Sequence, residues 1–204
     1  MKKGIFITFE GADGCGKTTQ IELIKKYLDL NNIDNVLTRE PGGCDLGLEL
    51  RKILLHYEKP VSNIAELFLY LADRAQHTEF TIKPLLAEGK MVLCDRYIDS
   101  TVAYQGYARG QDIEKIIELN NLVTKNLKPD LTIVFDIDSN LAQSRLKGEK
   151  DRLEKEGLEF HKALRKGYLE LAKSNPERIK VISSDDTIEN IHKQCVELIK
   201  GYIN

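Results

Sequence analysis

The sequence of 204 residues lacks several features that mark whole classes of protein. Its 4 cysteines show neither the spacing of metal ligands nor the density of a disulfide-stabilised scaffold. The 30 Lys and Arg residues nearly balance 32 Asp and Glu residues, and a net charge of −2 argues against general binding to nucleic acid or to a membrane surface. No apolar run approaches the roughly 18 residues of a membrane-spanning helix. These absences predict a soluble, reduced protein of the cytoplasm.

Other absences concern the organisation of the chain. It has no internal repeat, no low-complexity tract and no linker rich in Pro, Gly or Ser. Its first residues lack the long apolar run of a signal peptide and are expected to enter a strand. A chain of this length can bury roughly 70% of its unfolded surface, so it needs no disulfide or metal to fold. We therefore expect a single domain over residues 1–204.

Short apolar segments alternate with longer segments of helical periodicity. The predicted strands are Ile5–Phe9, Asn35–Thr38, Met91–Cys94, Leu131–Asp136 and Lys180–Ile182. The predicted helices are Lys17–Leu30, Leu46–His56, Ile64–His77, Asp112–Asn126, Leu141–Lys147, Leu158–Ala172 and Thr187–Tyr202. This alternation indicates an α/β fold, with a five-stranded parallel sheet between two layers of helices.

A glycine-rich loop follows the first predicted strand and opens the first predicted helix. Its residues match the pattern G-x-x-x-x-G-K-[ST] at every fixed position: Gly11-Ala12-Asp13-Gly14-Cys15-Gly16-Lys17-Thr18. The glycines allow backbone N–H groups to surround phosphate oxygens, and the helix N-terminus favours an anion. Lys17 can reach the β- and γ-phosphates, and the Thr18 hydroxyl can ligate Mg²⁺. The loop therefore predicts a nucleoside triphosphate site.

The rest of the chain narrows the kind of nucleotide-using protein. A guanine-specific GTPase needs an N/T-K-x-D stretch, and the nearest approach, Thr124-Lys125-Asn126-Leu127, lacks the Asp. Signatures of ABC-type ATPases and helicases are also absent. A small kinase that uses ATP fits this length best.

Charged residues follow the predicted strands at the edge where α/β proteins bind ligands. Asp95 follows the third strand and could hold Mg²⁺ together with Thr18. Arg39 and Arg96 follow separate strands and could converge on a second phosphate. The pair therefore suggests that the acceptor of the phosphoryl group is itself phosphorylated.

These residues, with their flanking segments, resemble the thymidylate kinases among the P-loop nucleoside monophosphate kinases, over nearly the whole chain. The segments are Phe9–Thr19, Thr38-Arg39-Glu40-Pro41-Gly42-Gly43, Asp95-Arg96-Tyr97-Ile98-Asp99-Ser100 and Ala103-Tyr104-Gln105-Gly106. The resemblance implies an α/β three-layer P-loop kinase fold and a homodimer. It also implies that MgATP phosphorylates dTMP to dTDP, a step in dTTP biosynthesis.

The resemblance further implies a role for individual residues. ATP would be bound by residues of the loop and the start of its helix: Gly11, Ala12, Asp13, Gly14, Cys15, Gly16, Lys17, Thr18 and Thr19. Asp13 would contact the sugar 3′-hydroxyl and help place the acceptor phosphate, which Arg96 would bind with Arg39 nearby. Tyr70 would stack on thymine, although the family usually has Phe there, and Arg74 would hydrogen-bond a base carbonyl.

Further residues would complete the acceptor pocket. Thr101 and Gln105 look like the polar readers of the base edge, and Tyr104 like the wall that excludes a ribose 2′-hydroxyl. Arg51 and Leu55, four residues apart, look like additional wall residues.

The charged segment 147–157 reads on its own as a solvated loop, and by resemblance as the lid over ATP. Some family members have an Arg in the P-loop where this chain has Gly14, so the catalytic cation is expected from the lid. Arg152 is the preferred candidate, and Lys147 and Lys150 are also available. Arg145 could flank the adenine or the β-phosphate, and the two arginine roles could be exchanged. The turn Ser183-Ser184-Asp185-Asp186 could border the adenine or cap the last helix.

Catalysis is thus assigned to Lys17, Arg96, Arg152 and Asp13, with Mg²⁺ on Thr18 and Asp95. Two other interpretations remain open. The acceptor could be another monophosphate such as dUMP or UMP, which Tyr70, Arg74 and Gln105 would decide. The chain could also be an inactive nucleotide-binding module, although such a module would be free to lose Lys17 or Arg96.

Overall fold

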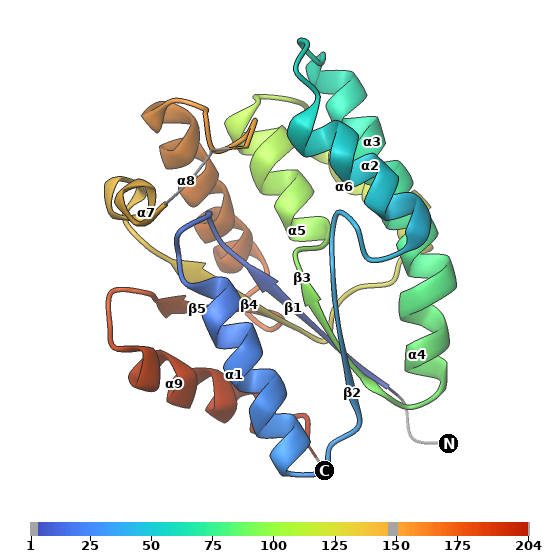
Figure 1. Cartoon of the computed structure of the whole chain (residues 1–204), viewed down its shortest axis with the longest axis vertical. Coiled ribbons are helices and arrows are strands. Elements are labelled where there is room, and N and C mark those ends of the chain that lie inside the picture. Colours follow the sequence, from blue (N-terminus) through green and yellow to red (C-terminus); the bar gives the residue numbers. More distant parts are fainter. Residues whose placement is uncertain (1–3, 147–150, 204) are drawn as a thin grey trace.

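The computed structural model describes residues 4–146 and 151–203, and in them a parallel sheet of five strands forms the centre (Figure 1). The strand order is β2-β3-β1-β4-β5. The strands are β1 (Ile5–Glu10), β2 (Asn35–Arg39), β3 (Met91–Asp95), β4 (Leu131–Asp136) and β5 (Ile179–Ser183). The three inner strands are almost fully buried, as expected for apolar strands covered on both faces. The predicted five-stranded parallel sheet is confirmed.

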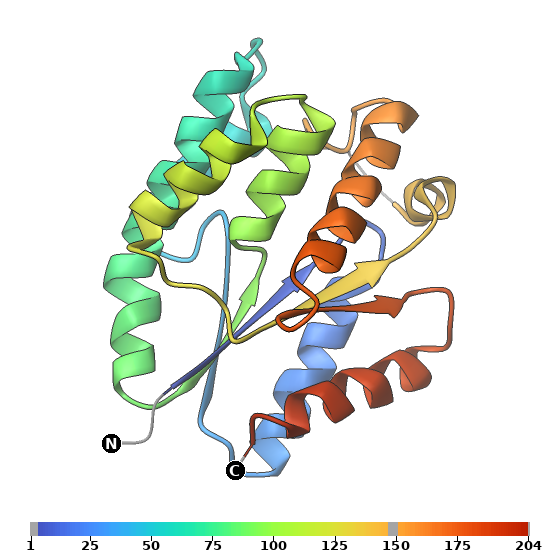
Figure 2. The same cartoon turned by 180° about the vertical axis from the view of Figure 1, so that it is seen from behind.

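Helices cover the two faces of this sheet, and alternation along each strand assigns side chains to one face or the other. Ile7 and Phe9 of β1 pack with α1 (Lys17–Leu30) and α9 (Ile188–Lys200). On the opposite face, Val134 of β4 packs with α8 (Leu158–Ser174) and with the π-helical segment η2 (Val102–Ala108). Figure 2 shows α8 and the green helix that contains η2 on this second face.

The remaining helices lie beside the second face and around its upper edge (Figure 1). They are α2 (Asp45–His56), α3 (Asn63–His77), the π-helical segment η1 (Thr78–Ile82), α4 (Lys83–Ala87), α5 (Ile98–Thr101), α6 (Ile113–Thr124) and α7 (Ser139–Arg145). No helix within residues 4–146 or 151–203 is both long enough and apolar enough to cross a membrane.

The predicted elements differ from the structure mainly in two segments. Residues 78–87 extend the α3 helix, and residues 98–108 form the α5–η2 helix, neither of which the periodicity predicted. Residues 98–106 are all buried, so the helix has no exposed face, and its polar and apolar residues do not follow an amphipathic period. The last predicted position of the helix Leu141–Lys147 lies outside the described residues, and α7 itself ends at Arg145.

The register of the strands determines where the functional residues meet. Arg39 of β2 and Phe9 of β1 both lie opposite Asp95 of β3. The loops that follow these three strands therefore leave the sheet at the same edge. This edge positions the P-loop beside the segments that begin at Glu40 and Arg96.

Candidate nucleotide-binding site

The P-loop joins β1 to α1 in a conformation that its glycines permit. Gly14 and Gly16 have φ angles of 82° and 84°, in a region of backbone conformation that residues other than glycine rarely adopt. A Cβ atom at position 14 would also overlap the carbonyl oxygen of Ala142 in α7. In this arrangement position 14 therefore has no room for a side chain such as arginine. Burial raises the pKa of the Cys15 thiol despite the charge of Lys17, which favours a packing role for Cys15.

One cavity lies along the outside of the P-loop and has a volume of about 530 Å³. It is lined by Ala12, Asp13, Gly14, Cys15, Gly16, Lys17, Thr18, Thr19, Gln20, Arg145, Ser184, Asp186, Ile188 and Ile191. Apart from Gly11, all the residues expected at the ATP site are in this set. Thr187, and not the turn before it, caps α9, since its hydroxyl accepts the Asn190 N–H at 3.2 Å. This leaves Ser184 and Asp186 beside the cavity, together with Ile188 and Ile191, which the sequence did not indicate.

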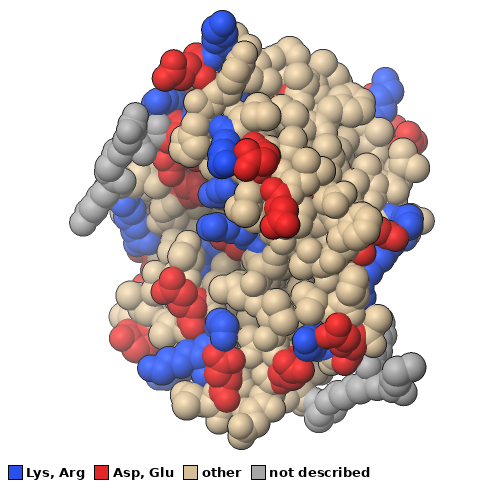
Figure 3. Space-filling model, turned by 45° about the vertical axis from the view of Figure 1, so that its right-hand side comes forward, with Lys and Arg blue, Asp and Glu red and all other residues tan. Residues whose placement is uncertain are grey.

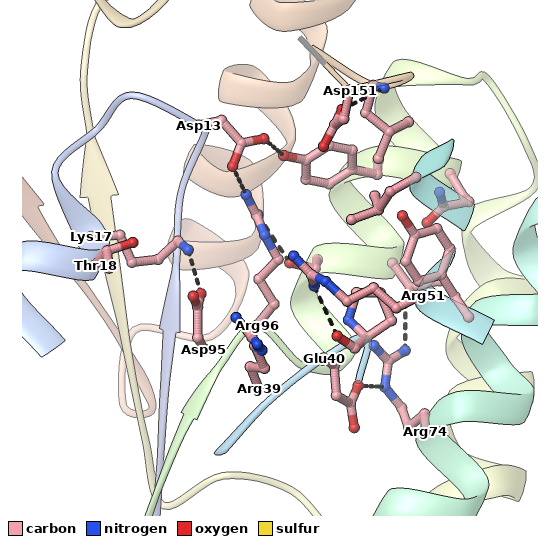
Figure 4. A pocket seen from close by; sticks show the side chains of 18 residues that line it. Asp13, Lys17, Thr18, Arg39, Glu40, Arg51, Arg74, Asp95, Arg96 and Asp151 are labelled. Carbon is pink, nitrogen blue, oxygen red and sulfur yellow. Dashed lines mark hydrogen bonds and ion pairs between the residues drawn. The ribbon is translucent and has the colours of Figure 1, made fainter. Parts of the chain in front are cut away.

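A second cavity, of about 220 Å³, opens on the inner side of the P-loop (Figure 4). All the residues expected to bind the acceptor line it: Asp13, Arg39, Arg51, Leu55, Tyr70, Arg74, Arg96, Thr101, Tyr104 and Gln105. They come from the P-loop, the ends of β2 and β3, and the helices α2, α3 and α5–η2. Asp13, Lys17 and Thr18 line both cavities, so the two cavities adjoin at the P-loop.

Cations and carboxylates alternate at the P-loop end of the second cavity. Arg96 donates to Asp13 Oδ1 at 2.6 Å and to the Gly11 carbonyl oxygen at 2.9 Å, and Lys17 forms an ion pair with Asp95. Burial would raise the pKa of Asp13, but the charges of Arg96 and Lys17 hold it below its usual value. Tyr104 donates to Asp13 Oδ2 at 3.2 Å, and its ring lies 5.1 Å from the Arg96 guanidinium carbon. An anion placed here would meet Lys17 and Arg96.

A buried network surrounds Arg74 at the other end of this cavity. Its Nε donates to Glu40 at 2.8 Å, and its Nη1 donates to Thr101 at 2.5 Å and to Asn120 at 2.7 Å. Its Nη2 donates to the carbonyl oxygen of Tyr97 at 2.8 Å. These bonds hold the guanidinium rigidly at the cavity wall. Of the supporting residues, sequence reasoning named Glu40 only as part of a motif and missed Asn120.

Glu66 is a further residue that sequence reasoning missed. It lies four residues before Tyr70 and eight before Arg74 on α3, a spacing that places the three on one side of the helix. It is only 1% exposed and accepts a hydrogen bond from Gln105 Nε2 at 2.9 Å. The spacing of four residues between Glu66, Tyr70 and Arg74 was the sequence feature that could have identified it.

Arg152 contacts α2 and α3 and lines neither of the two cavities. Its Nε donates to the carbonyl oxygen of Leu54 at 3.0 Å, and its Nη1 lies 2.5 Å from Glu66 Oε2. The neighbouring Asp151 and Leu153 line the acceptor cavity. Its contact with a transferred phosphoryl group therefore stays a prediction. The alternative lid cations Lys147 and Lys150 lie outside the described residues.

A parallel sheet with a P-loop, adjoined by a second cavity of alternating cations and carboxylates, defines a P-loop phosphotransferase with two substrate sites. The family model described as Thymidylate kinase matches residues 9–195. The chain belongs to the thymidylate kinase family.

Individual relatives agree with this assignment over nearly their whole length. The thymidylate kinase of a Nostoc species is 45% identical over 205 residues, which cover 98% of this chain and 97% of the relative. That of Caldanaerobacter subterraneus is 45% identical over 202 residues, with the same two coverages. The crystal structure of thymidylate kinase from Ehrlichia chaffeensis has a TM-score of 0.81 and 39% identity, and the match covers 96% of this chain and 98% of that one.

Proposed function

We propose that this chain, a thymidylate kinase that phosphorylates dTMP to dTDP, transfers the γ-phosphoryl group of ATP to dTMP across the two adjoining cavities. Phosphorylation of dTMP is the activity of the family to which the chain belongs. The observation that supports this use of the site is that Asp13, Lys17 and Thr18 line both cavities. A donor in the outer cavity and an acceptor in the inner one would therefore bring their phosphates together at these residues.

The roles at the phosphates follow from charge and position. Lys17 stabilises the negative charge that spreads over the transferred group, and Arg96 holds the acceptor phosphate. Asp13 fixes Arg96 through their 2.6 Å ion pair and remains available to the sugar hydroxyl. No general base is needed, because the acceptor phosphate is already an anion. Catalysis is then positioning combined with electrostatic stabilisation.

Mg²⁺ is the metal that these residues fit best. Thr18 and Asp95 supply a hydroxyl and a carboxylate beside the triphosphate loop. No cluster of three or more His, Cys, Asp or Glu side chains in the described part of the chain could hold a metal ion. Few protein ligands, completed by substrate phosphates and water, are typical of Mg²⁺ in kinases. When bound, the ion offsets phosphate charge.

Base selection is assigned to the far end of the inner cavity. Arg74, held by Glu40 and Asn120, would donate to a pyrimidine carbonyl, and Tyr70 would stack on the ring. Thr101 and Gln105 would read the remaining base edge, and Tyr104 would leave no room for a 2′-hydroxyl. A site that hydrogen-bonds an imide edge rejects cytosine, because buried groups would be left unpaired.

The segment 147–157 is proposed as a lid within a single domain. Arg152 would leave Glu66 when ATP binds and stabilise the moving phosphoryl group, while Arg145 flanks the nucleotide. The position of Arg145 supports this role, because the residue lines the outer cavity and its Nη1 lies 3.5 Å from the Ser184 carbonyl oxygen.

A location of the protein in the cytoplasm stays a prediction.

A substrate panel tests this function. ADP release would be measured with MgATP against dTMP, dUMP, UMP, dCMP, AMP and GMP. We expect a strong preference for dTMP, with Arg74→Ala reducing dTMP use far more than it reduces ATP binding. Preferred turnover of dUMP or UMP would retain the phosphoryl chemistry and refute the assignment of the base-reading residues. Absence of turnover with every acceptor would favour an inactive nucleotide-binding module.

A homodimer through the helices α2, α3 and α6 is also proposed. Figure 3 brings the side with α2, α3 and α4 forward and shows a broad surface with few charges. Exposed apolar side chains on these helices include Ile53, Ile64, Phe68, Ile117 and Leu122, and Phe68 and Leu122 are 54% and 72% exposed. Large exposed apolar patches are typical of protein interfaces.

Light scattering after gel filtration measures the mass that this interface predicts. The native chain should have twice the mass of one 23.2 kDa chain. Phe68→Glu should shift that mass toward one chain, because a carboxylate would be buried at the interface without a partner. Gln194→Glu, at an exposed position on α9, adds the same single negative charge away from these helices and serves as the control. A native mass of one chain would exclude the dimer.

A further inference from the structure

A group of four charges around the buried carboxylate of Glu66 connects α3 to the segment after residue 150. Glu66 on α3 accepts from Arg109, whose Nε and Nη2 each lie 3.3 Å from one of its oxygens, and from Arg152 at 2.5 Å. Arg109 also pairs with Glu156 at 2.6 Å. Two carboxylates thus balance two guanidinium groups. Glu66 can remain charged although it is almost fully buried.

The charge state of Glu66 determines what it can do to its neighbours. Burial alone would raise the pKa of its carboxyl, but the hydrogen bonds from Gln105 and Arg109 and the charges of Arg109 and Arg152 hold it below its usual value. Glu66 is therefore ionised near neutral pH. An ionised carboxylate accepts hydrogen bonds and donates none.

This restriction fixes one end of the Gln105 side chain. The amide of Gln105 has an NH₂ group that only donates and an oxygen that only accepts. Glu66 lies 2.9 Å from the nitrogen, and a carboxylate in that place would repel the amide oxygen. The amide must therefore turn its NH₂ toward Glu66. Its oxygen is the end left to meet a molecule in the cavity that Gln105 lines.

We propose that Glu66 is a positioning residue that holds the Gln105 amide oxygen toward the acceptor, and thereby selects a base with an N–H at that edge. The inference rests on the proposed assignment of Gln105 to the base. Thymine and uracil have an N–H at ring position 3, whereas cytosine has an acceptor there. A Gln105 amide free to rotate would present either group, so discrimination against cytosine would fall.

Steady-state kinetics of Glu66→Gln with dTMP, dUMP and dCMP tests the proposal. The ratio of kcat/KM for dTMP to kcat/KM for dCMP should fall at least about tenfold. One buried hydrogen-bonding group that faces the wrong partner has an effect of this size. The dTMP:dUMP ratio should stay within about twofold, because these bases share the same edge and differ only in a methyl group. Glu22→Gln, at an exposed position on α1, is the matched control and should change neither ratio. An equal loss with all three acceptors would overturn the proposal, since a merely structural role predicts that result.

Gln105→Leu separates failure of this inference from failure of the site assignment. If Gln105→Leu leaves the dTMP:dCMP ratio unchanged, Gln105 does not read the base and the assignment itself is wrong. If Gln105→Leu lowers the ratio and Glu66→Gln does not, only the role of Glu66 is wrong. Adding Glu66→Gln to Gln105→Leu should cause no further fall in the ratio, whereas an additive fall would also contradict the proposal.

An exchange of the two residues keeps the test decisive if Glu66→Gln does not fold. In the double variant Glu66→Gln, Gln105→Glu, the amide at 66 can donate to the carboxylate at 105. That carboxylate still presents an acceptor to the base, and the net charge is unchanged. The dTMP:dCMP ratio should return to within about threefold of the native value, a difference of less than one hydrogen bond. A ratio as low as that of Gln105→Leu would refute the proposal.

Discussion

At the level of single residues, Arg152 has two competing partners, which are Glu66 and the transferred phosphoryl group. In the structure it neutralises Glu66, which is 1% exposed and would otherwise depend on Arg109 alone for its charge balance. The proposed reaction would require Arg152 at the transferred phosphoryl group, beside Asp13, Lys17 and Thr18, which line both cavities. If Arg152 leaves, Glu66 is not left as an unpaired buried charge, because Arg109 remains bound to it.

Arg152→Ala should lower kcat by about 100- to 1,000-fold if Arg152 stabilises the transferred group. The loss should be similar for dTMP and dUMP, and the KM for ATP should change much less than kcat. Lys162→Ala, at an exposed position on α8, serves as the control. A normal kcat with a raised KM for dTMP would mean that Arg152 acts only through Glu66. The rates would be measured by ADP release at saturating MgATP.

The contact between α8 and η2 matters at the scale of elements, because η2 contains the acceptor residues Tyr104 and Gln105. The two helices pack closely at Gly167 of α8, where a Cβ atom would lie 2.8 Å from Cβ of Tyr107. Tyr107 cannot withdraw easily, since the close atoms belong to the base of its side chain. The glycine therefore sets the distance between α8 and the acceptor cavity.

Gly167→Ala should destabilise the fold by about 1–3 kcal/mol through overpacking, although alanine favours the helix by about 1 kcal/mol. It should also raise the KM for dTMP, because η2 must shift. Gly201→Ala at the end of α9 is the control, since its φ is −61° and the nearest atom to an added Cβ is 3.6 Å away. Urea unfolding measures both variants. Equal stability of the two would contradict the packing argument.

A comparison of two helices shows which helices the sequence pattern can predict. The bounds of α1 were predicted without error, because one face of that helix meets the sheet and the other meets solvent. The α5–η2 helix was not predicted, because it is enclosed by α6, α8 and the sheet. Burial on all sides removes the periodic contrast on which such predictions depend.

Buried carboxyl groups affect the stability of the whole molecule. Glu10, at the end of β1, is fully buried and accepts hydrogen bonds from Tyr97, Ser100 and Tyr168. Burial and the nearby charge of Asp99 raise its pKa from 4.5 to about 7. Between these two values the folded protein binds more protons at Glu10 than the unfolded chain. The contribution of Glu10 to the free energy of unfolding therefore falls as pH rises from about 4.5 to 7.

Glu10→Gln should remove this contribution while keeping most hydrogen bonds. The shift corresponds to a difference on the order of 3 kcal/mol, fully expressed above about pH 7. The free energy of unfolding in urea would be measured from pH 5 to pH 8 for both proteins. The variant should gain stability relative to the native protein as pH rises. Parallel pH profiles would mean that Glu10 titrates normally.

The sequence by itself determined the sheet, the P-loop and the charged residues Arg39, Asp95 and Arg96 at the ends of its strands. These depend on local information: the period of apolar residues, the glycines that a phosphate loop requires, and charged residues directly after strands. The resemblance to the thymidylate kinases added the acceptor residues, and the structure brings all of them to one cavity.

Only the tertiary structure decided which partner each of these side chains meets. Arg152 faces Glu66, and Glu66 meets Gln105, across separations of 86 and 39 residues. No local pattern encodes such pairs, because helix packing brings α3, η2 and the segment after residue 150 together. Buried charges then select their partners by proximity, since in a dry interior an unpaired charge costs several kcal/mol.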